Sequence, residues 1–161
     1  MASWVRQRAE QVQKEEERRQ QEREWAIAQE KIVARKIRPL WEQLVACVTQ
    51  DVAEINKEFA FDRSRETEFF ISENPCKIVV YKSRYPAVRL TASLDEERHS
   101  INVLYATTQH DHAPTYERKL SIKFHLDDKG DLYLTQERPM TCSEASQFLL
   151  EQVISPAKDF L

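Results

Sequence analysis

Glycine is almost absent from this sequence: Gly130 is the only one in 161 residues. Phosphate-binding loops, dinucleotide-binding turns and nucleophile elbows all depend on glycine, because their backbone adopts positive φ or approaches a ligand closely. One glycine cannot build any of these motifs. The shortage therefore argues against nucleotide-dependent enzymes with such loops and against serine hydrolases of the elbow type.

Cysteines are also few, and long hydrophobic runs are missing. Cys47, Cys76 and Cys142 are too widely spaced to form a zinc-ligand pattern or a disulfide framework, so free thiols in a reducing compartment are the simplest interpretation. No hydrophobic run approaches the ~20 residues of a transmembrane helix, and charged residues soon follow Met1 where a signal peptide would have a hydrophobic segment. We therefore expect a cytoplasmic protein with no membrane partner.

The charge is unevenly distributed, although the net charge of the whole chain is only −3. Residues 1–38 contain 10 Lys or Arg and 7 Asp or Glu, a net charge of +3, whereas residues 39–161 contain 14 and 20, a net charge of −6. A domain with net negative charge has no general attraction for polyanions. The balance disfavours nucleic acid as a partner and leaves only a local basic patch open.

Residues 1–38 have the composition of a solvated helix. Glu, Gln, Arg, Lys and Ala predominate, all of which favour helix formation, and Glu10 and Lys14 form an i,i+4 pair in the favourable order. No hydrophobic residue occurs between Val12 and Trp25, so a continuous coiled-coil seam cannot run through the segment. We expect residues 1–38 to form a charged helical arm.

The remaining residues, 39–161, are predicted to form a single α+β domain whose main helix lies between Pro39 and Phe59. Hydrophobic residues recur there at steps of three and four, which places them along one stripe of a helix. They are Leu40, Trp41, Leu44, Val45, Val48, Val52, Ile55 and Phe59. Pro39 suits either the first turn of a new helix or a kink in one long helix that includes the arm.

After Phe59 the hydrophobic period changes from helical to two, which is typical of strands with one buried face. The alternating segments are residues 68–72, 77–81, 88–93, 100–106, 119–126 and 132–135. Short turns separate most of them, and Gly130 suits the left-handed position of a hairpin loop. The pattern predicts an antiparallel meander of about six strands.

A second helix is predicted after Thr141, because Thr141 and Glu144 have the spacing of a capping box. Its hydrophobic stripe comprises Ala145, Phe148, Leu149 and Val153. The predicted fold class is therefore α+β: a long charged N-terminal helix, an antiparallel meander of about six strands covered on one face by helices, and a C-terminal helix.

The candidate binding residues come from the polar face of the predicted sheet and from the basic segment around its second turn. They combine cationic side chains with an imidazole and an aromatic ring, which together can contact phosphates and stack on bases. They are Arg84, Arg89, Lys123, His125 and Tyr133. A solvated sheet face is the simpler explanation, because Tyr133 is the only aromatic residue among these positions.

The candidate metal ligands are His110 and His112, which flank Asp111 in a polar loop. No further ligand has motif spacing, so a solvated loop is the simpler interpretation, and we predict no metal or other cofactor. No nucleophile has a base at an informative spacing. We therefore predict no catalytic residues.

Two functional classes remain open, and an enzyme is less favoured than either. The first, which we prefer, is a non-enzymatic protein-interaction module whose N-terminal helix mediates self-association or docks on a protein partner. The alternative is a domain that binds a small molecule or nucleic acid, in the cleft between sheet and helices or on the polar face of the sheet.

Overall fold

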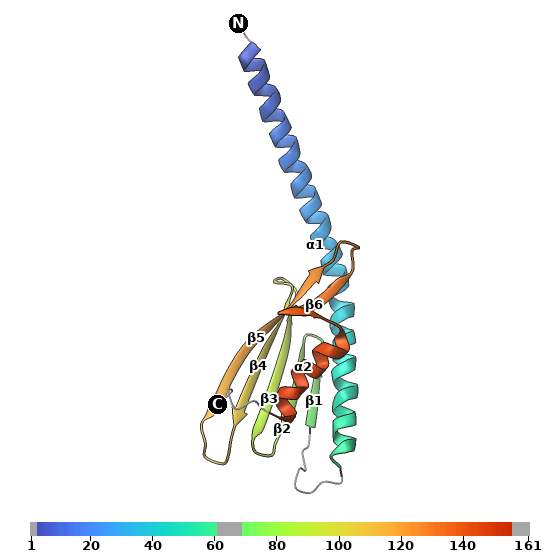
Figure 1. The fold of residues 1–161 in the computed structure, drawn as a ribbon, viewed down its shortest axis with the longest axis vertical. Helices are drawn as coiled ribbons and strands as arrows, with labels where there is room; N and C mark the ends of the chain where they lie inside the picture. The colour runs from blue at the N-terminus through green and yellow to red at the C-terminus, as the bar shows by residue number, and fades with distance from the viewer. Residues whose placement is uncertain (1–2, 61–68, 156–161) are drawn as a thin grey trace. The chain divides into compact units, whose positions relative to one another are not determined.

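The computed structural model describes residues 3–60 and 69–155 (Figure 1). In chain order the elements are α1 (Ser3–Glu58), β1 (Phe69–Asn74), β2 (Lys77–Lys82), β3 (Ala87–Asp95), β4 (Ser100–Thr108), β5 (Thr115–Leu126), β6 (Leu132–Gln136), β7 (Arg138–Met140) and α2 (Cys142–Ile154). The chain forms two compact units, Met1–Arg35 and Lys36–Leu161. The predicted α+β class is confirmed.

Helix α1 contains the hydrophobic stripe that its period predicts. In the second unit Trp41, Leu44 and Val48 are at most 1% exposed, while Glu42 and Gln43 are exposed between them. Pro39 lies within the helix, where it lacks the N–H that would bond to the carbonyl four residues earlier. The helix nevertheless continues through it, so residues 3–58 form one helix.

The sheet has seven strands in the order β1-β2-β3-β4-β5-β6-β7, and each pairs antiparallel with the next. The prediction of about six strands missed β7, because this strand has only three residues and no alternation. Pro139 lies in the middle of it, and proline within a sheet is confined to edge strands and bulges because it cannot donate a ladder hydrogen bond.

One face of the sheet provides the core. The register aligns Val80 of β2 with Leu90 of β3, and Leu90 with Tyr105 of β4. All three are 0% exposed. Helix α2 packs on this inner face, where the Tyr105 hydroxyl donates a hydrogen bond to the Leu149 carbonyl at 2.7 Å. Burial beneath the helix raises the pKa of the Tyr105 hydroxyl.

Helix α2 also contacts α1. The Ser146 hydroxyl donates to the Asp51 carboxylate at 2.6 Å, and Ser146 is fully buried. The start of α2 has the predicted capping box: the Glu144 amide donates to Thr141 Oγ1 at 3.1 Å, and the Thr141 amide donates to Glu144 Oε1 at 3.3 Å. The capping box therefore stabilises the N-terminus of α2, and the two hydrogen bonds from Ser146 and Tyr105 join the helix to α1 and to the sheet.

The hairpin loop between β5 and β6 also forms as predicted. Gly130 has φ of 83°, a conformation that other residues rarely adopt. The Asp127 carboxylate accepts hydrogen bonds from the amides of Lys129 at 2.9 Å and Asp131 at 2.8 Å. The aspartate therefore satisfies backbone donors that the turn leaves outside the ladder.

Lys82 is the one lysine buried within the described part of the chain. It is 8% exposed and lies between Phe69 of β1 and Val88 of β3 on the inner face. Burial lowers the pKa of its ammonium group, because the charged form loses hydration. The folded state therefore holds this proton less tightly than the unfolded state does.

We expect Lys82→Met to raise the free energy of unfolding at pH 7 by about 0.5–2 kcal/mol, the usual range for a single stabilising substitution. The gain should shrink as the pH rises from the lowered pKa of Lys82 toward the ordinary lysine value. Over that range Lys82 loses its proton in the folded protein, so its side chain becomes neutral like the methionine of the variant. Urea unfolding at pH 7 and pH 10 measures both effects. Lys77→Met, at an exposed position of the same strand, is the matched control, and equal changes for the two variants would contradict the prediction.

Candidate interaction surfaces

The described part of the first unit, residues 3–35, is helical throughout, and a single helix has no interior in which to bury its own side chains. Trp4, Trp25 and Ile27 are 70%, 67% and 53% exposed. The ion pair between Arg18 and Glu22, at 3.7 Å, is exposed and contributes little to stability. The arm therefore presents large hydrophobic side chains near its N-terminus and about two thirds of the way along it, whereas Val33 and Ile37, nearer its C-terminal end, are buried.

The five predicted binding residues lie in two separate parts of the sheet. Arg84 is in the connection between β2 and β3, and Arg89 of β3 lies between Tyr81 and Ala106 on the outer face. The other three are on β5 and β6: Lys123, His125 and Tyr133. The structure therefore does not bring all five candidates into one site.

Two of these candidates are direct neighbours. His125 pairs with Tyr133 in the ladder between β5 and β6, and their rings are stacked, with centroids 6.0 Å apart and an angle of 29° between the planes. The pair could provide a stacking surface.

An exposed aromatic row on the outer face was missed in the sequence. Phe70 of β1 lies beside Tyr81 of β2, which lies beside Arg89 of β3. Phe70 is 55% exposed and Tyr81 is 38% exposed. The available signal was the adjacent pair Phe69 and Phe70, because consecutive strand residues point to opposite faces and both rings cannot be buried by one set of helices.

The loop histidines, His110 and His112, each lie close to Asp111. His110 Nδ1 is 2.9 Å from the Asp111 carbonyl, and His112 Nε2 is 3.6 Å from the Asp111 carboxylate. All three residues are exposed. Within residues 3–60 and 69–155, no cluster of three or more His, Cys, Asp or Glu side chains is arranged to hold a metal ion.

The cysteines are free thiols, as predicted, and each is half-buried. Burial is the main reason that the pKa of Cys142 is raised, which lowers the fraction of the reactive thiolate. Its thiol lies 3.8 Å from the Leu40 carbonyl, so it packs against α1. The geometry indicates a structural role for Cys142.

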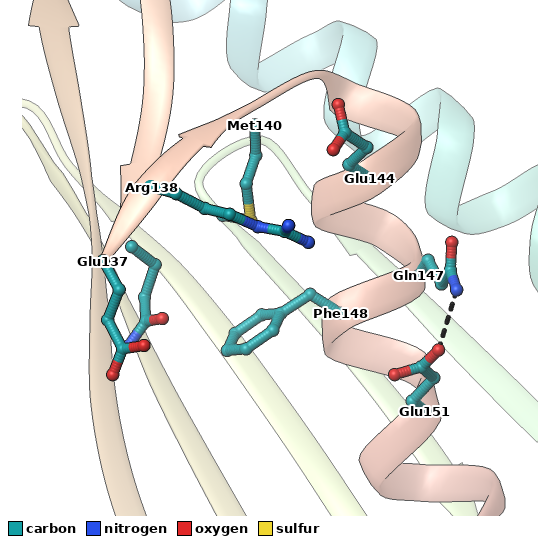
Figure 2. A pocket seen from close by; sticks show the side chains of 8 residues that line it. Glu137, Arg138, Met140, Glu144, Gln147, Phe148 and Glu151 are labelled. Atoms are coloured by element: carbon teal, nitrogen blue, oxygen red, sulfur yellow. Dashed lines mark hydrogen bonds between the residues drawn. The ribbon is translucent and has the colours of Figure 1, made fainter.

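Two hollows lie on either side of a ridge on α2, and Gln147 and Glu151 line both of them. The first, of about 550 Å³, is bounded by α2 and the β6–β7 region (Figure 2). Figure 2 shows the Arg138 side chain extending from β7 toward α2, with Phe148 facing it from the helix. The ridge itself is formed by Gln147 and Glu151, joined by a hydrogen bond of 2.8 Å. Glu144 and Glu137 complete the charged part of this lining.

The second hollow, of about 470 Å³, lies between α1 and α2, and we call it the acidic groove. Its acidic residues are Asp51, Glu54 and Glu58 of α1 and Glu151 of α2. Its hydrophobic residues are Ile55, Phe59, Leu150 and Ile154. Among the lining residues that the structure describes there is no Lys, Arg or His, so a cation could enter without meeting like charge.

No helix within the described ranges is both long enough and hydrophobic enough to cross a membrane. Comparisons of the chain with protein-family models, with curated proteins and with solved structures gave no match.

Proposed function

We propose that this protein is a non-enzymatic protein-interaction module whose N-terminal helix docks on a protein surface. The observation that supports this is the exposure of Trp4 and Trp25, at 70% and 67%, within residues 3–31 of α1, none of which is buried. Complete burial of a large hydrophobic side chain contributes about 1.5–3 kcal/mol. Tryptophan is also among the residues that most often dominate the binding energy of an interface.

The composition of the arm supports the same function. Between Val12 and Trp25 its residues are charged or Gln, which keeps the helix soluble but gives it no face for packing. Helices in proteins gain most of their stability from packing of a hydrophobic face. A partner that covers Trp4 or Trp25 would supply that packing and would make the arm more ordered.

We expect Trp4→Ala and Trp25→Ala together, in the full chain, to weaken association at least tenfold in Kd, because about 1.4 kcal/mol of lost burial corresponds to a factor of ten. Light scattering over a range of concentrations measures self-association, and retention of proteins on the immobilised full chain measures docking on other partners. Amide exchange in residues 3–24 should slow on association and be fast in the free chain.

The matched control is Gln13→Ala with Gln21→Ala, two exposed positions of the same helix, which should leave association unchanged. The free energy of unfolding should change by less than about 0.5 kcal/mol in both double variants, because all four residues are exposed. Unchanged association and unchanged retained proteins in the tryptophan double variant would contradict the proposed function.

The aromatic row on the outer face supports a second candidate function, which is binding of single-stranded nucleic acid. Phe70 and Tyr81 could stack on bases while Arg89 contacts a phosphate. The net charge of −6 on residues 39–161 opposes this. Anisotropy of a labelled oligonucleotide tests it: binding that weakens with salt and is lost in Phe70→Ala with Arg89→Ala would favour this candidate, whereas no binding at low salt would remove it.

A further inference from the structure

We infer that the acidic groove between α1 and α2 binds the distal arm segment, residues 4–12, of a second copy of this chain. The inference rests on the proposed function, to which it adds the partner and the receptor surface. Two features of the same chain carry it: an exposed helix segment with basic and hydrophobic residues, and a groove with hydrophobic and acidic residues.

The groove combines a hydrophobic floor with carboxylates at its rim. Leu150 is buried, while Ile55 and Ile154 are half-buried, so part of their hydrophobic surface remains accessible. Glu54 and Glu58 are exposed beside them. These two carboxylates are i,i+4 neighbours on α1, where like charges repel. A cation bound at this position would relieve that repulsion.

The groove is large enough for a side-chain anchor. Its volume of about 470 Å³ lies within the range of about 300–1,000 Å³ that is usual for ligand-binding pockets. A helix that lies in such a groove is held by hydrophobic residues at i, i+3 or i+4, and i+7 or i+8. The occupant should therefore be a helix with hydrophobic side chains at these spacings and with positive charge between them.

The distal arm segment has hydrophobic residues at the first and last of these positions and an arginine at the middle one. At about 3.6 residues per turn, Trp4, Val5, Arg8 and Val12 lie on one side of the helix. Trp4, Val5 and Val12 are 70%, 49% and 39% exposed. Arg8 lies between these hydrophobic residues, one turn after Trp4 and one turn before Val12. This face can place hydrophobic groups on the floor of the groove and a guanidinium at its carboxylates.

The chain's other candidates match this groove less well. Trp25 has Gln21, Glu22, Ala28 and Gln29 as its neighbours one turn away, so no cation lies one turn from it, whereas Arg8 lies one turn from Trp4. The neighbouring hollow beside β7 contains the guanidinium of Arg138, which would repel an arginine. Of these combinations, the distal segment with the acidic groove gives the best match of charge and hydrophobicity.

A charge exchange tests the inference in the full chain. Arg8→Glu alone, and Glu54→Lys with Glu58→Lys, should each weaken self-association at least tenfold in Kd, as measured by sedimentation equilibrium. The three substitutions combined in one chain should restore most of it, because opposite charges again face each other. Association of the native chain should also weaken as salt is raised, since the paired charges lie at a rim.

Glu42→Lys is the matched control. Glu42 is an exposed residue of α1 that lines a different hollow, together with Arg38 and Ala46. It reverses a charge on the same helix outside the groove and should leave association unchanged. Circular dichroism of each variant checks that the fold is retained.

Two results would overturn the inference. Self-association that is lost in Trp4→Ala but unchanged in the groove variants would place the arm on another surface, and the proposed function would stand. A native chain that stays monomeric at every concentration would exclude a second copy as the partner. In that case the proteins retained by the immobilised chain, with and without Trp4→Ala, would decide the proposed function separately.

Discussion

Replacing Trp41 by alanine is expected to lower the free energy of unfolding by about 3–5 kcal/mol. Trp41 is 1% exposed, so its removal loses a large buried hydrophobic area and leaves a cavity. The substitution also removes a hydrogen bond, because Trp41 Nε1 donates to the Pro75 carbonyl at 2.9 Å. This bond links α1 to the turn between β1 and β2, so the substitution weakens the joint between helix and sheet.

Trp41→Phe separates the two contributions. It keeps most of the ring volume but loses the N–H, and the hydrogen bond alone is expected to be worth about 0.5–1.5 kcal/mol. Urea unfolding followed by circular dichroism measures both variants without relying on tryptophan fluorescence. Trp25→Ala, at a position 67% exposed, is the control and should change stability by less than about 0.5 kcal/mol. A loss below about 1 kcal/mol in Trp41→Ala would show that the indole is not packed as described.

Leu44→Ala is expected to lower the free energy of unfolding by about 2–5 kcal/mol. Leu44 is 0% exposed in the middle of the α1 stripe, so the lost methyl groups leave space that the surrounding helices and sheet fill only in part. The same urea titration measures the effect.

Glu42→Ala serves as the control for Leu44→Ala, because it is an exposed residue of the same helix and alanine favours helix formation. Its expected change is within about 0.5 kcal/mol. A similarly small change in Leu44→Ala would mean that this face of α1 is not covered by the rest of the domain.

Most of the fold could be predicted because burial imposes a period on the sequence. The steps of three and four that contain Leu44 and Val48 identify the buried face of α1, and strict alternation identifies strands with one buried face. The capping box at Thr141 and the glycine at position 130 depend only on local backbone geometry. Features of this kind require no knowledge of distant residues.

The start of β5 and the whole of β7 were missed, because neither shows an alternation of hydrophobic and polar residues. Strand β5 begins at Thr115, four residues before the predicted segment, because Tyr116 and Arg118 are exposed and the positions around them are polar. Strand β7 is too short to show alternation. The residues at the start of β5 and in β7 belong to the sheet because they pair with a neighbouring strand. That pairing exists only in the folded chain, so the sequence pattern of the strand itself does not reveal it.

The acidic groove could not be predicted for a related reason. Glu54 and Glu58 belong to the polar side of a helix in the sequence, where solvation explains them fully. They become part of a groove only because α2 places Leu150 and Ile154 beside Ile55. The sequence shows that these two residues are acidic. It does not show that they lie beside hydrophobic residues of α2, because that depends on the contact between two helices that are about 90 residues apart in the chain.

The proline in β7 has a consequence for aggregation. An exposed sheet edge is a template on which a strand from another molecule can add, and repeated addition leads to fibrils. Pro139 lies in the last strand of the order and offers no N–H to an incoming chain. This end of the sheet is therefore protected against growth by strand addition.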